Sequence, residues 1–155
     1  MNLLKEKIMK ILLATDGSAY SKAAIDEIAN RSYPIKTQVR IVSVYDRVQL
    51  ITAMGPMGVS QEYYAAADLE ASKAAEAATE IASKILHKKN PSLTISTIVI
   101  QGSPKSSILE EAEKFGADLI VVGSHGYGAV ERFLLGSVSQ AVALHAKCSV
   151  EIVRK

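Results

Sequence analysis

The most informative stretch of this sequence is Val121-Val-Gly-Ser-His-Gly-Tyr-Gly-Ala-Val-Glu-Arg-Phe-Leu-Leu-Gly-Ser-Val138. An apolar strand runs into Gly123 and Gly126, and after nine further residues Gly136-Ser137 opens a helical pattern. Glycine lets main-chain N–H groups come close to an anion, and a helix N-terminus adds unpaired donors and the positive end of the helix dipole. The stretch therefore predicts a phosphate-binding segment at the carboxyl end of a strand.

Apolar runs of strand length alternate with helical patterns along the rest of the chain. Strict alternation indicates one parallel sheet with helices on both faces, because parallel strands need crossover connections. Strands are predicted over residues 10–15, 39–45, 93–100, 118–122 and 149–153, and helices over residues 19–30, 61–88, 104–115 and 138–146.

Familiar capping residues mark the helix ends. Ser18 and Ser103 can accept hydrogen bonds from free N–H groups, Pro104 suits a first helical turn, and Gly116 suits a left-handed C-cap. The helix over residues 61–88 is rich in alanine, which permits close approach to a sheet. The larger side chains expected to reach the core from this helix are Leu69, Ile81 and Ile85.

Length and composition limit the class of protein. The chain has 155 residues, enough for one domain, and a net charge of +2 with no broad basic face for nucleic acid. A single cysteine, Cys148, excludes an internal disulfide and suits a reducing compartment. No signal-peptide pattern is recognisable, and no apolar run approaches the ~20 residues that cross a bilayer. We expect a soluble cytoplasmic protein without membrane or nucleic-acid partners, with residues 1–8 as an extension ahead of a domain over residues 9–155.

Three predicted strand ends should surround one cleft. In an open parallel sheet, ligands bind outside the carboxyl ends of the strands, where the direction of the connections reverses. The segments at these ends are Asp16-Gly17, residues 44–46 and residues 123–126. Asp16 has two interpretations: it contacts the ligand, with its carboxylate as a candidate ligand of a phosphate-bound Mg²⁺ or Mn²⁺, or it organises only its own turn.

Other polar residues near this cleft have no clear role in the sequence. His125 could act as an acid or base, but no nucleophile with an orienting carboxylate is recognisable around it, which favours hydrogen bonding within the loop. Arg132 and Lys105 could offset phosphate charge or simply be solvated. The irregular segment over residues 46–60 is a candidate lid or partner surface.

Two common nucleotide-binding patterns are excluded. A Walker loop requires lysine before the serine, and the residue before Ser137 is Gly136. A dinucleotide fingerprint requires Gly-x-Gly-x-x-Gly directly after the first strand, where this chain has Asp16-Gly17-Ser18. The glycine-rich segment must therefore belong to another kind of binding site.

The remaining pattern, Gly123-x2-Gly126-x9-Gly136-Ser137, resembles that of universal stress proteins of the ATP-binding branch, Gly-x2-Gly-x9-Gly-Ser/Thr. Residues 10–18, Lys-Ile-Leu-Leu-Ala-Thr-Asp-Gly-Ser, also resemble the opening strand and acidic turn of that family. The resemblance covers residues 10–153. It implies a single-domain, Rossmann-like α/β fold of the adenine nucleotide alpha hydrolase type, an open sheet of five parallel strands in the order 3-2-1-4-5 with helices on both faces.

The resemblance also implies roles for individual residues. Asp16 would contact the adenosine, and the main chain of Val44 would hold the adenine edge. Val122 and Gly123 would lie under the adenosine and ribose. Gly126, Gly136, Ser137 and Val138 would hold the phosphates. A homodimer would form by antiparallel pairing of the last strand, Cys148 to Val153, in which Ser149 replaces a frequent proline. The residues assigned to the ATP site are Ala14, Thr15, Asp16, Val44, Val122, Gly123, Gly126, Gly136, Ser137 and Val138.

The resulting hypothesis is an ATP-binding protein that acts as a regulatory or stress-response module rather than as an enzyme. Phosphoryl transfer needs positioned charge, a metal and an oriented nucleophile, and no acceptor site is recognisable. Two alternatives stay open. One is a slow ATP hydrolase or a nucleotidyl or phosphoryl transferase using Asp16 or His125, and the other is an interaction protein whose nucleotide site stays empty.

Overall fold

The computed structural model describes residues 7–47, 61–128 and 134–155. Within these ranges every predicted element is present, and each end lies within one residue of its predicted position. None of the described helices combines the length and hydropathy that crossing a membrane requires. The elements are β1 (Lys10–Ala14), α1 (Ala19–Asn30), β2 (Gln38–Tyr45), α3 (Gln61–Lys89), β3 (Thr94–Gln101), α4 (Pro104–Phe115), β4 (Leu119–Gly123), α5 (Ser137–His145) and β5 (Ser149–Val153).

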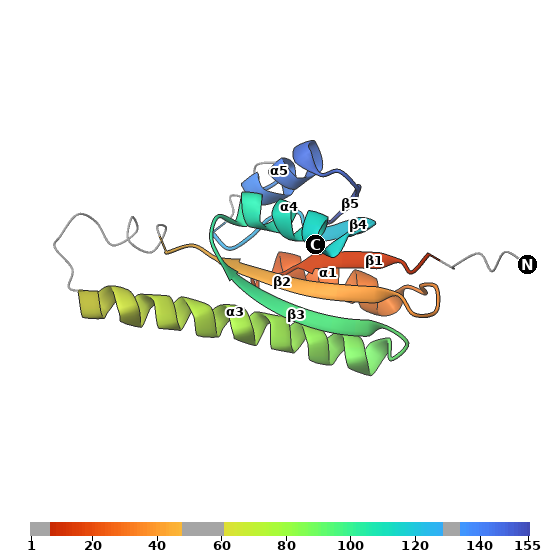
Figure 1. Ribbon diagram of the computed structural model, residues 1–155, viewed down its shortest axis with the longest axis horizontal. Coiled ribbons are helices and arrows are strands. Elements are labelled where there is room, and N and C mark those ends of the chain that lie inside the picture. The colour runs from red at the N-terminus through yellow and green to blue at the C-terminus, as the bar shows by residue number, and fades with distance from the viewer. Residues whose placement is uncertain (1–6, 48–60, 129–133) are drawn as a thin grey trace, which may run out of the picture.

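The five strands form one parallel sheet in the order β3-β2-β1-β4-β5. Helices α1 and α3 cover one face of this sheet, and α4 and α5 cover the other (Figure 1). The predicted open sheet with two covered faces is confirmed. The direction of the connections reverses between β1 and β4, which places a crevice at the carboxyl ends of these strands.

The core consists of two apolar layers, one on each face of the sheet. Along β1, Ile11 and Leu13 pack toward α1 and α3, whereas Leu12 packs toward α4 and α5. All three side chains are fully buried. A strand covered on both faces must be apolar at every position, which explains why β1 reads as a continuous apolar run.

The prediction for the core contacts of α3 was wrong at two of three positions. Leu69 is 55% exposed and Ile81 is 58% exposed, while Ile85 packs at the border of the core. At about 100° per residue, Leu69 and Ile81 lie roughly a third of a turn from the centre of the buried face. That face consists of Ala75, Ala78, Thr79, Ala82 and Leu86.

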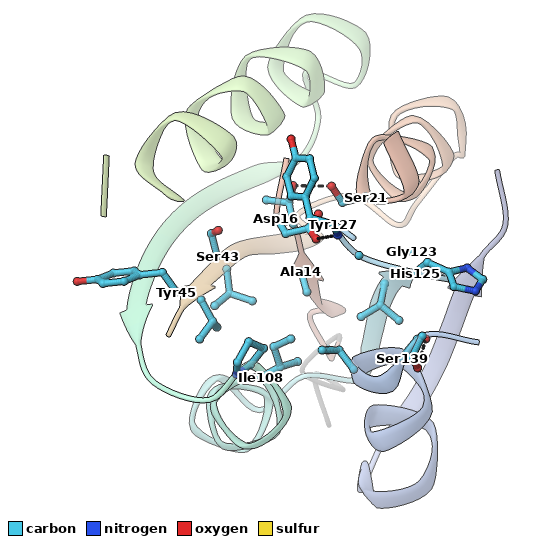
Figure 2. A pocket seen from close by; sticks show the side chains of 18 of the residues that line it. Ala14, Asp16, Ser21, Ser43, Tyr45, Ile108, Gly123, His125, Tyr127 and Ser139 are labelled. Atoms are coloured by element: carbon cyan, nitrogen blue, oxygen red, sulfur yellow. Dashed lines mark hydrogen bonds between the residues drawn. The ribbon is translucent and has the colours of Figure 1, made fainter. Parts of the chain in front are cut away.

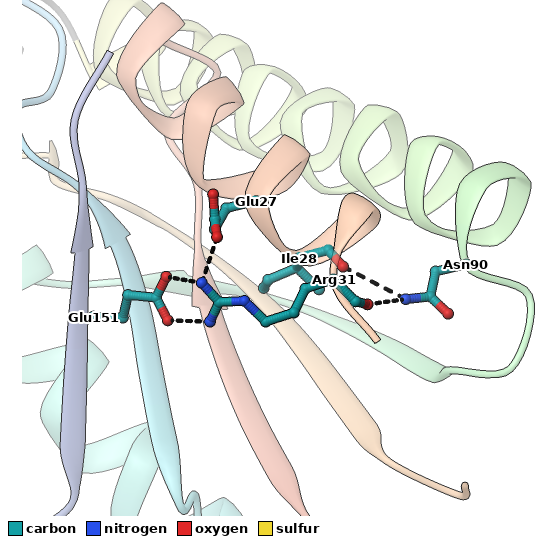
Figure 3. Close-up of polar contacts among 5 residues, drawn as sticks. All are labelled: Glu27, Ile28, Arg31, Asn90 and Glu151. Carbon is teal, nitrogen blue, oxygen red and sulfur yellow. Dashed lines mark hydrogen bonds and ion pairs between the residues drawn. The ribbon is translucent and has the colours of Figure 1, made fainter. Parts of the chain in front are cut away.

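Arg31, directly after α1, fastens the edge strand β5 to the rest of the fold (Figure 3). Its guanidinium pairs bidentately with Glu151 of β5, with N–O distances of 2.7 and 2.9 Å, and also pairs with Glu27. The main-chain carbonyl of Arg31 accepts a hydrogen bond of 2.9 Å from Asn90 Nδ2. Strand β5 begins at Ser149, as predicted.

Asp118 ties the start of β1 to the residues before β4. Its Oδ2 accepts a 3.0 Å hydrogen bond from the main-chain N–H of Lys10, and its Oδ1 lies 2.6 Å from Nζ of Lys7. The hydrogen bond from Lys7, followed by the one from the Lys10 main chain, lowers the pKa of Asp118 below its ordinary value of 3.8.

Asp118→Asn is therefore expected to destabilise the protein in a pH-dependent way. A lowered pKa in the folded state means that the carboxylate contributes stability above the ordinary pKa and loses it as the pH falls through the folded value. Because Lys7 is exposed, the loss at about pH 7 should be below about 1 kcal/mol. Urea unfolding at about pH 7 and about pH 2 measures it, and a difference that does not shrink in acid would contradict the role of the charge.

Candidate functional site

A cavity of about 680 Å³ opens at the carboxyl ends of β1, β2 and β4, within the usual size range of ligand pockets. The three strand ends predicted to meet do line this one cavity. Residues of α3, α4 and the start of α5 complete its wall. All ten residues that the sequence assigned to the ATP site line it: Ala14, Thr15, Asp16, Val44, Val122, Gly123, Gly126, Gly136, Ser137 and Val138. Their role in binding stays a prediction.

The cavity extends to both sides of the sheet edge. Figure 2 shows Asp16, Ser43 and Tyr127 on the side of α1 and α3, whereas Ile108 points in from α4 on the opposite side. A ligand in this cavity would therefore lie across the ends of the strands, between the two layers of helices.

The two ends of the glycine-rich segment are joined by short hydrogen bonds. The main-chain N–H of Gly136 donates to the carbonyl oxygen of Ser124 at 2.7 Å. The hydroxyl of Ser139 donates to the same oxygen at 2.8 Å and lies 3.0 Å from the carbonyl oxygen of Gly136. These bonds place the N-terminus of α5 beside the loop that follows β4. Both predicted sources of phosphate-binding N–H groups therefore face the same part of the cavity.

Asp16 organises this region through main-chain hydrogen bonds. Its Oδ1 accepts from the N–H of Ser18 at 2.9 Å, and its Oδ2 accepts from the N–H of Tyr127 at 3.0 Å. The hydroxyl of Tyr127 donates in return to the carbonyl oxygen of Gly17 at 2.9 Å. The turn after β1 is thus fastened to the glycine loop after β4. The structure supports the organising role of Asp16, and its contact with a ligand stays a prediction.

His125 is held within the loop that carries it. Its Nδ1 lies 3.0 Å from the hydroxyl of Ser124, and its ring lies 5.1 Å from the ring of Tyr20. Ser124 is buried, so its hydroxyl is not accessible to a substrate as a nucleophile. This geometry agrees with a hydrogen-bonding role for His125.

Cations are scarce around the cavity. The described lining residues include Asp16 and Asp46 but no lysine or arginine, and Lys105 is not among them. Arg132, a candidate to offset phosphate charge, and residues 48–60 of the candidate lid lie outside the described residues. Over the part of the chain that the structure describes, no three His, Cys, Asp or Glu side chains gather as a metal site. Within the described lining, a bound anion would draw on main-chain N–H groups and the helix dipole.

The main chain of Val44 presents a donor and an acceptor to the cavity. Main-chain groups of successive strand residues point to alternate sides, and the N–H of Thr15 donates to the carbonyl oxygen of Val42. The main chain of Val42 therefore faces β1. Val44 lies two residues further along the strand, so its N–H and C=O point to the same side. Because the pairing with β1 ends at Ala14, opposite Val42, no strand of the described chain pairs with this edge of Val44.

Several lining residues were missed by the sequence analysis. Tyr127 is one of the nine residues between Gly126 and Gly136 that the motif leaves unspecified. Ser43 directly precedes Val44 at a predicted strand end, a position that could have marked it. Ala71 and Ala75 of α3 had no such signal, because their place against β2 depends on how the helix packs.

Comparison with known proteins identifies the family of this chain. The model of the universal stress protein family matches residues 7–154, nearly the whole chain. The chain belongs to the universal stress protein family. It is 34% identical over 145 residues to the putative universal stress protein SERP1273 of Staphylococcus epidermidis, covering 93% of this chain and 82% of that one. It is 32% identical over 148 residues to universal stress protein MJ0531 of Methanocaldococcus jannaschii, covering 94% and 82%.

Solved structures share the fold of this universal stress protein. The hypothetical protein MJ0577 aligns with a TM-score of 0.81 at 25% identity, covering 94% of this chain and 95% of that one. A universal stress protein of Arabidopsis thaliana with AMP bound aligns with a TM-score of 0.65 at 18% identity, covering 95% and 92%. A universal stress protein in complex with cAMP aligns with a TM-score of 0.62 at 22% identity, covering 95% and 97%.

Proposed function

We propose that this universal stress protein binds ATP in the cavity at the carboxyl ends of β1, β2 and β4, as a regulatory ligand. The observation that carries the proposal is that a polar segment suited to phosphate and a main-chain edge suited to a base line the same cavity. The AMP and cAMP held by two proteins of the same fold support an adenine nucleotide as the ligand.

The phosphates would lie against Gly126, Gly136 and Ser137. Main-chain N–H groups at the start of α5 and a serine hydroxyl are suited to anionic oxygens, and the helix dipole adds a favourable potential. Because the described lining lacks lysine and arginine, a triphosphate would bring a cation with it. Asp16 accepts a hydrogen bond from the N–H of Tyr127 in the glycine loop, and its oxygens would approach a phosphate-bound Mg²⁺ or Mn²⁺.

The adenine would pair with the main chain of Val44. One N–H donor and one C=O acceptor complement an edge of adenine, which offers a ring-nitrogen acceptor and an exocyclic amino donor. Ala14 and Val122 would supply apolar contacts to the base and ribose. The two halves of the site are thus separated across the sheet, with the base at β2 and the phosphates at β4 and α5.

Binding rather than turnover is proposed, because no described side chain beside the phosphate segment is placed as an activated nucleophile. Asp16 is engaged by two main-chain N–H groups, and the hydroxyl next to His125 is buried. An alternative is slow hydrolysis or group transfer that uses Asp16 or His125.

The decisive experiment identifies any nucleotide that copurifies with the protein and follows it in the presence of Mg²⁺. Intact ATP at about one per chain, and stabilisation by about 2.7 kcal/mol when ATP is added at about 100 times its Kd, would support the proposal. Conversion to ADP or AMP that survives repurification and is lost in Asp16→Ala or His125→Ala would support the enzyme instead. No nucleotide and no ATP-dependent rise in Tm would leave an interaction protein with an empty site.

A homodimer through β5 is part of the same proposal. Strand β5 is an edge of the sheet, and an unpaired edge is usually covered by another element or chain. Val150 and Ile152 pack against the core on the side of α4 and α5, so a partner strand would pair with the main chain of β5 rather than bury these side chains. Sedimentation of the purified protein tests the dimer.

A further inference from the structure

A carboxylate stands at the centre of the edge strand β5 and is neutralised by a cation from another element. Glu151 is the middle residue of β5, and its two carboxylate oxygens pair with the guanidinium of Arg31 at 2.7 and 2.9 Å. Its side chain is 26% exposed and that of Arg31 is 42% exposed, so water reaches both groups. Among the residues that the structure describes, no other lysine or arginine lies within ion-pair distance of Glu151. Without Arg31, the centre of this edge would therefore carry an unpaired negative charge.

The side chain of Glu151 points back over the sheet. Val150 and Ile152 pack on the side of α4 and α5, so Glu151 lies on the side of α1, because side chains alternate along a strand. Figure 3 shows its carboxylate directed from β5 across the sheet toward Arg31. Arg31 thus neutralises this carboxylate and also draws it away from the open edge of the strand.

The main chain of β5 determines how a second copy would pair with it. The N–H of Ser124 donates to the carbonyl oxygen of Val153, so the main-chain groups of Val153 and Glu151 face β4. Val150 and Ile152 therefore present their N–H and C=O groups to the open edge. In an antiparallel pair, Val150 of each copy would exchange hydrogen bonds with the partner's Ile152. Only in this register do all five residues of β5 face the β5 strand of the other copy, and it places the two-fold axis at Glu151.

This register brings two like charges together. The Glu151 residues of the two copies would form a non-hydrogen-bonded pair, in which the Cα atoms are about 4.5 Å apart. Side chains that are directly opposite in an antiparallel pair lie on the same face, and like charges there destabilise the pairing. A strand with this sequence therefore accepts a second copy only if the carboxylate at the axis is neutralised.

We infer that Arg31 permits self-association through β5, by pairing with Glu151 so that two copies of the strand can meet antiparallel about a two-fold axis at this residue. The inference rests on the homodimer in the proposed function, and it adds the register of the interface and the residue on which the interface depends. The partner is a second copy of the chain, because the edge groups are arranged symmetrically about Glu151 and each copy brings its own Arg31.

The first test measures the Kd of the dimer by sedimentation equilibrium in the wild type, Arg31→Gln, Glu151→Gln and the double variant. Arg31→Gln should raise this Kd by about 5-fold, which corresponds to about 1 kcal/mol, because two unneutralised carboxylates then face each other. Glu151→Gln and the double variant should associate at least as well as the wild type, because neither has opposed charges at the axis. Raising the salt from about 0.1 M to about 1 M should reduce the defect of Arg31→Gln by screening.

Lys22→Gln is the matched control, because it removes one positive charge from α1 on the side away from β5. Lys22 pairs with Asp26, and Asp26 also pairs with Lys89 of α3, so this pair faces α3. The dimer Kd should be unchanged in this variant. A rise equal to that in Arg31→Gln would attribute the effect to net charge and overturn the role of Arg31.

A cross-linking experiment tests the register. In a Cys148→Ser background, Glu151→Cys should form a disulfide between two copies on oxidation, because Cα atoms about 4.5 Å apart are within the range that a disulfide spans. Ser149→Cys in the same background is the control. In the proposed register Ser149 faces the partner's Val153, so the two substituted positions would be roughly 13 Å apart along the strands and should not cross-link. A non-reducing gel measures both results.

Each other result would overturn the inference in a distinct way. A wild-type protein that stays monomeric removes the proposed homodimer and this inference with it. If the wild type is a dimer, an unchanged Kd in Arg31→Gln rejects the role of Arg31 alone. A double variant as weak as Arg31→Gln would show that the ion pair acts only by holding β5 in place, since both variants lack it. Absence of the cross-link in a dimeric Glu151→Cys variant would move the two-fold axis away from this residue.

Discussion

Gly123→Ala should lower the free energy of unfolding by about 3 kcal/mol or more, because position 123 has no room for a side chain. A Cβ built there would lie 2.6 Å from the carbonyl carbon and oxygen of Tyr20 and 2.9 Å from the main-chain nitrogen of Ser21. These atoms belong to the first turn of α1, which cannot rotate away as a side chain can. Since a domain is stable by only about 5–15 kcal/mol, the loss would be a large share of the total. Urea unfolding measures it.

Gly102→Ala is a matched control for this substitution. Its Cβ would lie 2.7 Å from a single atom, the hydroxyl oxygen of Ser107, which can rotate to another position. The expected loss is therefore much smaller than at Gly123, although the first distances are similar. Equal losses in the two variants would contradict the argument from the α1 main chain. A large loss at Gly123 alone would show that this glycine serves helix packing, whatever it also does for a ligand.

The fold was predictable because its determinants are local in sequence. The central strands β1 and β4 are apolar runs, and the helix ends have side chains that act within a few residues. Ser18 accepts a hydrogen bond from the N–H of Ser21 at 3.2 Å, and Gly116 ends α4 with a φ of 70°. Such signals depend on neighbours in the chain, so they can be read before any tertiary contact is known.

The buried face of α3 was not predictable in the same way. Large apolar side chains suggested Leu69 and Ile81 as core contacts, but the sheet packs against the row that contains Ala78 and Ala82. In an alanine-rich helix several faces are similarly apolar, so periodicity does not select one. The choice depends on how closely the helix approaches β2 and β3.

The lining of the candidate cavity was predictable at the glycine-rich segment and only partly at the end of β2. The segment with Gly126 and Gly136 could be recognised from the sequence, because glycines before a helix start indicate available main-chain N–H donors. The hydrogen bond from the N–H of Tyr127 to Asp16 depends on which groups find a partner after folding. Which polar groups find hydrogen-bond partners is decided only when the chain packs.

Gly136→Val should abolish ATP binding while leaving most of the fold intact. A side chain here would enter the proposed phosphate space, and the structure gives a more direct reason for the loss. A Cβ at position 136 would lie 3.0 Å from Cα of His125 and 3.2 Å from the carbonyl oxygen of Ser124. Both are main-chain atoms, and the γ-methyl groups of valine would add to the crowding. The loop after β4 would have to move away from the start of α5.

That separation would remove the geometry on which the phosphate contacts depend. The N–H of Gly136 now donates to Ser124 at 2.7 Å, which holds the two sources of main-chain donors together. A hydrogen bond to a charged group contributes about 1.5–3 kcal/mol, so losing two should lower ATP affinity by about 100-fold or more. Gly136→Ala should give a smaller loss, because its single methyl group needs a shift of only a few tenths of an ångström. Calorimetric titration with ATP and thermal unfolding of the unliganded variants measure both effects, and full affinity in Gly136→Val would place the phosphates elsewhere in the cavity.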